Sequence, residues 1–260
     1  MRVIPERWHR RRRRDAEGTM TLVEHLEELR YRLIVSLVAV ALGGIVGWGL
    51  YDRVLELIQD PYCDYYATVP EGIRPTDRCA LFFAEPLGSV VIKLKIVAFL
   101  GLFFALPVVL LQLWRFIVPG LTKRERRLGV AFVISSVVLF GLGALFAYWS
   151  LPRALGFLLG FGGQQIVPLL TADRFFSFVM LVAFSFGIGF EFPIVLIFLN
   201  AAGIVSTDQL RSWRRGAILF IFVFGAIITP SGDPYTLLAL GLPMVLFYEA
   251  AIIVGRLLKR

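Results

Sequence analysis

The sequence contains little of what most enzymes use for chemistry. It has only two histidines, His9 and His25, and two cysteines, Cys63 and Cys79. It contains no G-x-x-x-x-G-K-[ST], no H-E-x-x-H and no G-x-S-x-G pattern. These absences exclude a P-loop nucleotide site, a zincin-type metal centre and a hydrolase nucleophile elbow. We therefore expect no catalytic residue, no metal ligand and no cofactor, and we rank an intramembrane enzyme last among the possible functions.

Charged side chains are also scarce in six long apolar windows, namely 33–51, 96–114, 128–152, 175–203, 216–229 and 234–255. Only two of these windows contain a charged residue, Glu191 and Glu249. A membrane-spanning helix needs about 20 apolar residues. Four windows reach that length, 234–255 reaches it with Glu249 inside, and 216–229 falls short. We expect an all-α integral membrane protein with six transmembrane helices, the fifth and sixth spans being short.

The positive charge of the chain is unevenly distributed between the segments that join these windows. Twenty of the 27 lysines and arginines fall before residue 33, in 115–127, in 204–215 or after residue 255. Because such residues accumulate in cytoplasmic loops, both termini are predicted to be cytoplasmic. Residues 1–20 read as a basic, disordered extension, and 21–258 as one membrane domain. The run Arg10–Arg14 is basic enough for nucleic acid, but we favour a plain cytoplasmic tail.

Glu191 is the residue that the bilayer disfavours most, because a carboxylate at mid-membrane costs several kcal/mol or more. One interpretation is a proton-linked or substrate-facing group. The other is a neutral acid bonded to a backbone carbonyl, such as the one that Pro193 frees. Glu249 lies nearer the cytoplasmic end of its span, where we favour a hydrated side chain without a special role.

Both cysteines fall in the first outside loop, about 52–92. That compartment permits disulfides, so we expect a Cys63–Cys79 bridge, with two free thiols as the alternative. Val54, Leu55 and Ile58 indicate a short surface helix ending before Pro61, since proline disfavours helix in the preceding residue. The second outside loop is expected at 153–173.

Three local signals concern the cytoplasmic side and the second span. Thr21 and Glu24 form a possible capping box, Ser206 is an expected N-cap, and Pro107 is an expected kink. Glu28 and Arg32 are spaced as an i,i+4 ion pair. Glu28 in the N-terminal segment and Glu125 in the loop 115–127 would form a two-carboxylate site if the two segments converge. Such a site suits a ligand with two guanidinium groups, because arginine offers a planar fork that lysine cannot copy.

Five motifs in chain order resemble the TatC family of the twin-arginine translocase. They are His25-Leu-Glu-Glu28-Leu-Arg30-Tyr-Arg32, Pro107-x4-Gln112-x-Trp114-x-Phe116-Ile-x-Pro119-Gly-Leu-x3-Glu125-Arg126-Arg127, Phe190-Glu191-x-Pro193, Thr229-Pro230 with Asp233, and Leu242-Pro243-x4-Tyr248-Glu249. The resemblance runs from about residue 21 to 250. The outside turn Pro-Ser-Gly-Asp departs from the usual Pro-Pro-Asp, which leaves the register of Asp233 open by one residue.

The resemblance implies a concave, glove-like bundle in the bacterial cytoplasmic membrane that recognises signal peptides with two consecutive arginines. It implies that Glu28 and Glu125 contact the arginine pair and that Arg30, Arg32, Phe116, Arg126 and Arg127 support recognition. It further implies that Glu191, with Gln112, Pro61 and Asp233, belongs to the sites for partners and function. The implied partners are single-span TatA and TatB proteins, further copies of this chain and lipid, and the implied driving force is the proton motive force.

A second hypothesis comes from the residues alone. Glu191 could serve a proton-coupled small-solute transporter. No internal repeat supports that hypothesis, although such repeats are common among secondary transporters.

Overall fold

The computed structural model describes residues 22–69, 79, 81–117, 129–160, 170–201, 203–229 and 232–257. They form helices whose bounds are α1 (Leu22–Thr68), α2 (Gly88–Ile117), α4 (Gly129–Gly160), α5 (Ala172–Ala201), α6 (Thr207–Ser212), α7 (Arg214–Ile228) and α8 (Pro234–Leu257). The only strand-like pairing in these residues is a single bridge between Phe82 and Thr171. The expectation of an all-helical protein is confirmed.

Five of the helices, α1, α2, α4, α5 and α8, are long and apolar enough to cross a membrane. The remaining apolar helix, α7, has 15 residues and falls short of the usual span, as its sequence window predicted. The sixth span was also expected to be short, and this is wrong, because α8 has 24 residues and is long enough to cross a membrane. Large apolar side chains are exposed along the long helices, for example Leu42, Leu145 and Leu246. A surface of this kind is suited to lipid and not to water. Six spans remain a prediction that the helix lengths alone do not establish.

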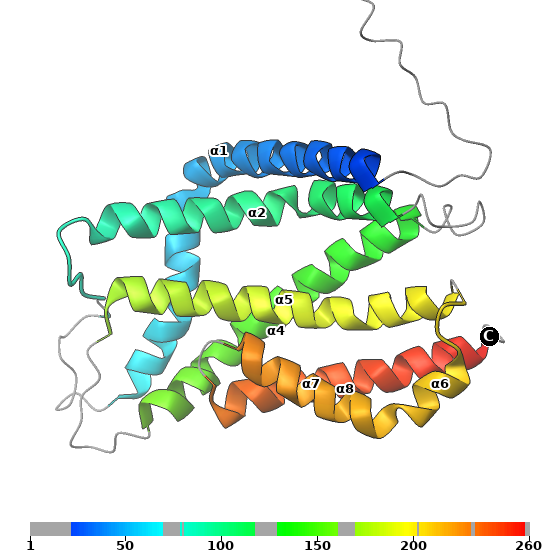
Figure 1. Ribbon diagram of the computed structural model, residues 1–260. Coiled ribbons are helices and arrows are strands. Elements are labelled where there is room, and N and C mark those ends of the chain that lie inside the picture. The colour runs from blue at the N-terminus through cyan, green and yellow to red at the C-terminus, as the bar shows by residue number, and fades with distance from the viewer. Residues whose placement is uncertain are drawn as a thin grey trace, which may run out of the picture.

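The bundle is arranged around α5, which lies between two groups of helices (Figure 1). On one side, α2 runs along α5 with the first part of α1 on its outer side, while α7 and α8 lie on the other side. Helix α4 crosses obliquely and packs most extensively on α5. The start of α1, the end of α2, α6 and the end of α8 all lie at one end of the bundle. We call this the recognition end, because the predicted recognition residues Glu28 of α1 and Phe116 of α2 fall there.

Two apolar cores hold these helices together. The first core lies away from the recognition end, where Ile58, Tyr62 and Tyr66 of α1 pack with residues of α2, α4 and α5. The second core joins α5 to α6, α7 and α8 around Phe186, Leu240 and further buried side chains. Each core is built from side chains at helical spacing, because i, i+4 and i+8 positions share one face of a helix.

Small residues allow the closest helix crossings. A Cβ atom on Gly43 of α1 would lie 2.6 Å from the carbonyl oxygen of Gly101 on α2. A Cβ atom on Gly143 of α4 would lie 2.5 Å from the carbonyl oxygen of Phe186 on α5. In lipid, where apolar surface gains little by leaving its surroundings, this close van der Waals packing is the main source of helix association.

Two predicted helix ends are wrong. Helix α1 continues through Pro61 to Thr68, and α4 continues through Pro152 to Gly160. Proline removes one backbone hydrogen bond from a helix. In both helices the extension buries apolar side chains in the first core, including Tyr62 and Tyr66 in α1 and Leu155 in α4. The burial of these large apolar side chains offsets the lost hydrogen bond. The helix expected to end before Pro61 therefore continues to Thr68. The first part of the loop expected from residue 153 is likewise helical, up to Gly160.

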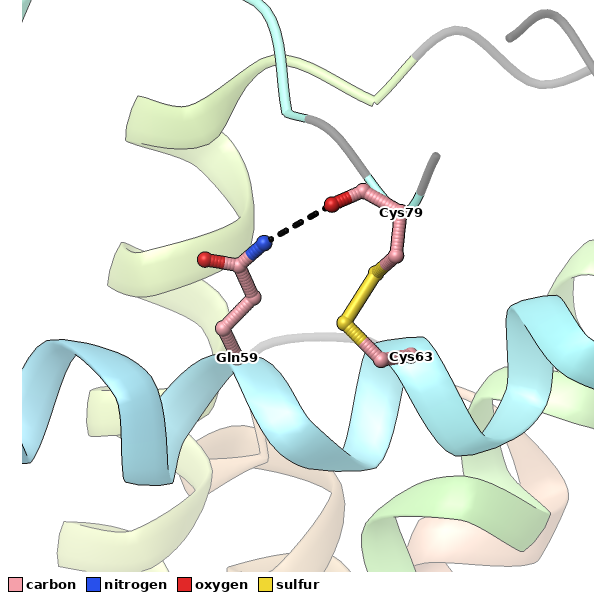
Figure 2. Close-up of a disulfide and its surroundings, with 3 residues drawn as sticks. All are labelled: Gln59, Cys63 and Cys79. Atoms are coloured by element: carbon pink, nitrogen blue, oxygen red, sulfur yellow. Dashed lines mark hydrogen bonds between the residues drawn. A yellow bond between two sulfur atoms is a disulfide. The ribbon is translucent and has the colours of Figure 1, made fainter. Parts of the chain in front are cut away.

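The predicted disulfide is confirmed. Cys63 of α1 is bonded to Cys79, with their Cα atoms 5.4 Å apart, and no described cysteine is free (Figure 2). The Gln59 side-chain amide donates a hydrogen bond of 3.1 Å to the carbonyl oxygen of Cys79, one turn before Cys63 on the same helix (Figure 2). Cys79, which precedes the strand-like segment at Phe82, is thereby joined to the last turns of α1 by a disulfide bond and a hydrogen bond.

Capping was predicted correctly at one position. The hydroxyl of Ser206 accepts a hydrogen bond from the Gln209 backbone, and the Gln209 side chain bonds the Ser206 backbone in return, which is a complete capping box. The helix that follows, α6, occupies much of the segment that was expected to be a basic turn. The possible capping residue Thr21 and the basic extension 1–20 lie outside the described residues.

Asp233 stands immediately before α8. Its carboxylate oxygen Oδ1 accepts a hydrogen bond of 2.8 Å from the Thr236 backbone N–H, and Oδ2 accepts one of 2.5 Å from the Thr236 hydroxyl. Proline at 234 then takes the first helical position, where its missing N–H is not needed. This is the geometry of a helix N-cap, and the side chain is only 6% exposed.

The bridge should be intact in protein purified from an oxidising compartment. Alkylation followed by mass measurement should label neither cysteine until a reductant is added. In the chain-entropy model, closing a loop of this size stabilises the fold by about 3 kcal/mol. Labelling of Cys63 or Cys79 without reductant would contradict the bridge.

Capping by Asp233 can be separated from its charge. Asp233→Ala should lower the free energy of unfolding by about 0.5–2 kcal/mol, whereas Asp233→Asn, which still caps, should change it much less. Thermal unfolding of both variants in detergent measures this difference. If Asp233→Asn were as unstable as Asp233→Ala, capping would not explain how the Asp233 carboxylate stabilises the fold.

Candidate functional site

A cluster of polar side chains lies at the recognition end, between the start of α1 and the end of α2. Glu28 and Arg32 come from α1, one helical turn apart, and Gln112 comes from α2. Arg32 Nη2 donates to Glu28 Oε1, and Arg32 Nη1 donates to Gln112 Oε1 over 3.3 Å. The predicted i,i+4 pair is confirmed, and Gln112 extends it to the neighbouring helix.

The cluster is nearly closed to solvent but incompletely bonded. The side chains of Glu28 and Arg32 are 13% and 16% exposed. Glu28 Oε2 and Arg32 Nε are buried and have no hydrogen-bond partner among the described residues. An unpaired buried oxygen on a carboxylate carries a desolvation penalty of about 1–3 kcal/mol or more. Glu28 is therefore ready to accept a further donor.

Aromatic contacts fix the surroundings of this carboxylate. His25, one turn before Glu28, stacks on Phe116 with ring centroids 4.4 Å apart. Trp114 is 4% exposed and stacks on Phe132 of α4 at 4.9 Å. A Cβ atom on Gly129 would lie 2.0 Å from Trp114 Nε1, so only glycine lets α4 begin this close to the end of α2.

The structure brings only some of the predicted recognition residues together. Glu28, Arg32, Gln112 and Phe116 meet at this cluster, while Arg30 is exposed on α1. Glu125, Arg126 and Arg127 lie outside the described residues, so the convergence of the two carboxylates stays a prediction. Sequence reasoning missed the part of His25. Its position three residues before Glu28, on the same helix face, was the available signal.

Glu191 lies elsewhere, on α5. Its Oε1 atom is buried without a hydrogen-bond partner in the described residues. Ser136 of α4 is also fully buried, and its hydroxyl likewise lacks a hydrogen-bond partner among the described residues. A backbone carbonyl was considered as the partner of a neutral Glu191, and none is found for Glu191 Oε1 among the described residues. The pair is an intramembrane polar site with unused hydrogen-bonding capacity.

Three other predicted residues have different surroundings. Pro61 is buried in α1, 33 positions along the helix from Glu28. Asp233 caps α8. Glu249 forms an ion pair of 2.5 Å with Arg214 at the start of α7. The ordinary role favoured for Glu249 is consistent with this exposed pair.

The recognition-end cluster offers a hydrogen-bond acceptor, Glu28 Oε2, to a cationic donor. A carboxylate that already accepts one guanidinium at Oε1 can accept a second donor at Oε2. The described residues contain no group of histidine, cysteine, aspartate or glutamate side chains that could hold a metal ion. This geometry is suited to binding a ligand that donates hydrogen bonds.

Comparison with known proteins gives the same family as the motifs. The family model "Sec-independent protein translocase protein (TatC)" matches residues 24–243. The chain is 46% identical to a Sec-independent protein translocase protein TatC of Frankia casuarinae, covering 100% of this chain and 72% of that protein. It is 41% identical to the TatC protein of Aquifex aeolicus, covering 93% and 97%.

A solved structure agrees with these sequence relatives. The crystal structure described as twin arginine translocase receptor TatC superposes with a TM-score of 0.73 at 40% identity. The match covers 91% of this chain and all of that chain. The family model, the relatives and the fold thus coincide over nearly the whole membrane domain, and this chain belongs to the TatC family of Sec-independent protein translocase proteins.

Proposed function

We propose that this chain is the signal-peptide receptor and core subunit of a twin-arginine translocase, with Glu28 as the acceptor for a signal arginine. The observation that carries the proposal is the buried Oε2 atom of Glu28, which has no partner while Oε1 is held by Arg32. Family membership supplies the class of ligand.

The chemistry of the site explains why arginine is preferred to lysine. A guanidinium donates two parallel hydrogen bonds to a carboxylate, or bridges a carboxylate and a nearby amide oxygen. Glu28 Oε2 and the amide of Gln112 offer acceptors of both kinds near Arg32. A lysine ammonium acts as a point charge and cannot donate two parallel hydrogen bonds, so it gains less at this site. Each partly desolvated, charge-assisted hydrogen bond contributes about 1.5–3 kcal/mol.

Arg32 prepares the carboxylate for this role. It orients Glu28 by holding one oxygen, and Gln112 holds Arg32 from the other side. An incoming arginine can then bind Oε2 without the cost of orienting a flexible side chain. Glu125, Arg126 and Arg127 would supply the second carboxylate and its charged surroundings.

The proposed orientation places the recognition end in the cytoplasm of a bacterial inner-membrane protein. The start of α1 and the end of α8 lie at this end, which supports cytoplasmic positions for both termini (Figure 1). Helix α7 serves as a short fifth span, which gives six spans in total. Neighbouring lipid thins, or flanking helices tilt, to match its length.

The unpaired Glu191 and Ser136 are proposed to face TatA- or TatB-type partner helices in the membrane. A polar side chain on a partner span would complete their hydrogen bonds at a depth where water cannot. No nucleotide-binding motif was found in the sequence, so the proposed energy source is the proton motive force. Family membership argues against the solute-transporter hypothesis for the same glutamate.

Photocrosslinking tests the proposed site directly. A photoreactive residue in place of the exposed Tyr31 should crosslink an Arg-Arg signal peptide in membranes, and a Lys-Lys peptide about tenfold less. Glu28→Gln should remove most of the difference, because the neutral amide cannot accept a charge-paired fork.

Glu27→Gln is the matched control, since Glu27 is the adjacent glutamate and is exposed. It should leave the crosslink unchanged. Equal crosslinking of both signal peptides, or equal effects of the two glutamine variants, would refute Glu28 as the acceptor.

A further inference from the structure

A cleft of about 620 Å³ opens at the end of the molecule away from the recognition end, between the last turns of α1 and the extension of α4. Asp64, Tyr65 and Thr68 of α1 form one wall. Trp149, Pro152, Arg153 and Gly156 of α4 form the other. The cleft exists because both helices continue through a proline, and it has no part in the proposed recognition of signal peptides.

The cleft contains two opposite charges that do not neutralise each other. Asp64 and Arg153 are both exposed, and neither forms an ion pair with any described residue. The Arg153 guanidinium lies 4.3 Å from the centre of the Trp149 ring, which holds it at the cleft wall by a cation–π contact. Cys63, bonded to Cys79, stands directly before Asp64 and fixes the opposite wall. The arrangement suits a ligand that carries both an anion and a cation.

An apolar stripe leads along α4 to this cleft. Val138, Leu142, Leu145 and Trp149 follow one another at spacings of three and four residues and are 53%, 51%, 63% and 59% exposed. Such spacing places them on one face of the helix, followed by Arg153. Tryptophan is enriched where hydrocarbon meets the lipid headgroups. A lipid at this face would therefore have its acyl chain on the stripe and its headgroup at the cleft.

We propose that the cleft binds a phospholipid headgroup that carries a phosphate and a primary ammonium group, as in phosphatidylethanolamine. Arg153 binds the phosphate through its guanidinium fork. Asp64 accepts hydrogen bonds from the ammonium group. A choline headgroup has no N–H to donate, and a glycerol headgroup has no positive charge for Asp64. The acyl chain packs on Leu142 and Leu145.

Native mass spectrometry of the whole chain can test this site. The protein is placed in micelles with equal amounts of phosphatidylethanolamine, phosphatidylcholine and phosphatidylglycerol, and the retained lipids are counted. We expect preferential retention of phosphatidylethanolamine. Arg153→Gln and Asp64→Asn should each lower it about tenfold, which corresponds to one charge-assisted hydrogen bond. Arg53→Gln, at an exposed arginine of α1 outside the cleft, is the matched control and should have no effect.

Two further readouts keep the result interpretable. Each variant must form the disulfide and elute as a single species, which shows that the cleft walls are intact. Soluble glycerophosphoethanolamine should not displace the lipid at equal concentration, because it lacks the chain that packs on the stripe. Displacement would assign the cleft to a free headgroup compound and overturn the lipid. Equal retention of the three lipids, or equal loss in Arg153→Gln and Arg53→Gln, would overturn the site itself.

Discussion

The absence of water in the bilayer is the constraint on which this structure depends. Helices satisfy the hydrogen bonds of the backbone there. Polar side chains must find partners within the protein or lie at the ends of the bundle. Lys95 of α2 meets Asp173 at 2.5 Å and Ser177 at 3.0 Å, and Arg214 meets Glu249. The apolar faces of the helices are held together by close packing, as at Gly43 and Gly101.

Against this background the few incompletely bonded groups are informative. Among the described residues, Glu28 has one oxygen on Arg32 and one without a partner, and Glu191 Oε1 and the Ser136 hydroxyl are buried without a hydrogen-bond partner. A membrane protein pays for such groups in stability unless a ligand completes them. We propose that a signal arginine completes the first and a partner helix the second. Both assignments follow from the same physical rule at two different depths.

Much of this arrangement could be predicted from the sequence. The apolar windows gave the helices, the i,i+4 spacing gave the Glu28–Arg32 pair, and two cysteines in one outside loop gave the disulfide. The errors occurred at Pro61, where local propensity predicts an end, and after Pro152, where the apolar window ends. Contacts between distant segments, such as Tyr62 with Phe175 at 5.5 Å between ring centroids, keep the helix intact there. The contact of Gln112 with Arg32 also depends on helix packing, which no local pattern contains.

The central claim is that Glu28 distinguishes a guanidinium from an ammonium group. A double-mutant cycle measures this most directly, by equilibrium binding of Arg-Arg and Lys-Lys signal peptides to the wild-type chain and to Glu28→Gln in lipid nanodiscs. The account predicts that exchanging arginine for lysine weakens binding about tenfold or more in the wild type and little in the variant, a coupling of about 1.4 kcal/mol or more. An equal loss of affinity in both proteins would contradict it.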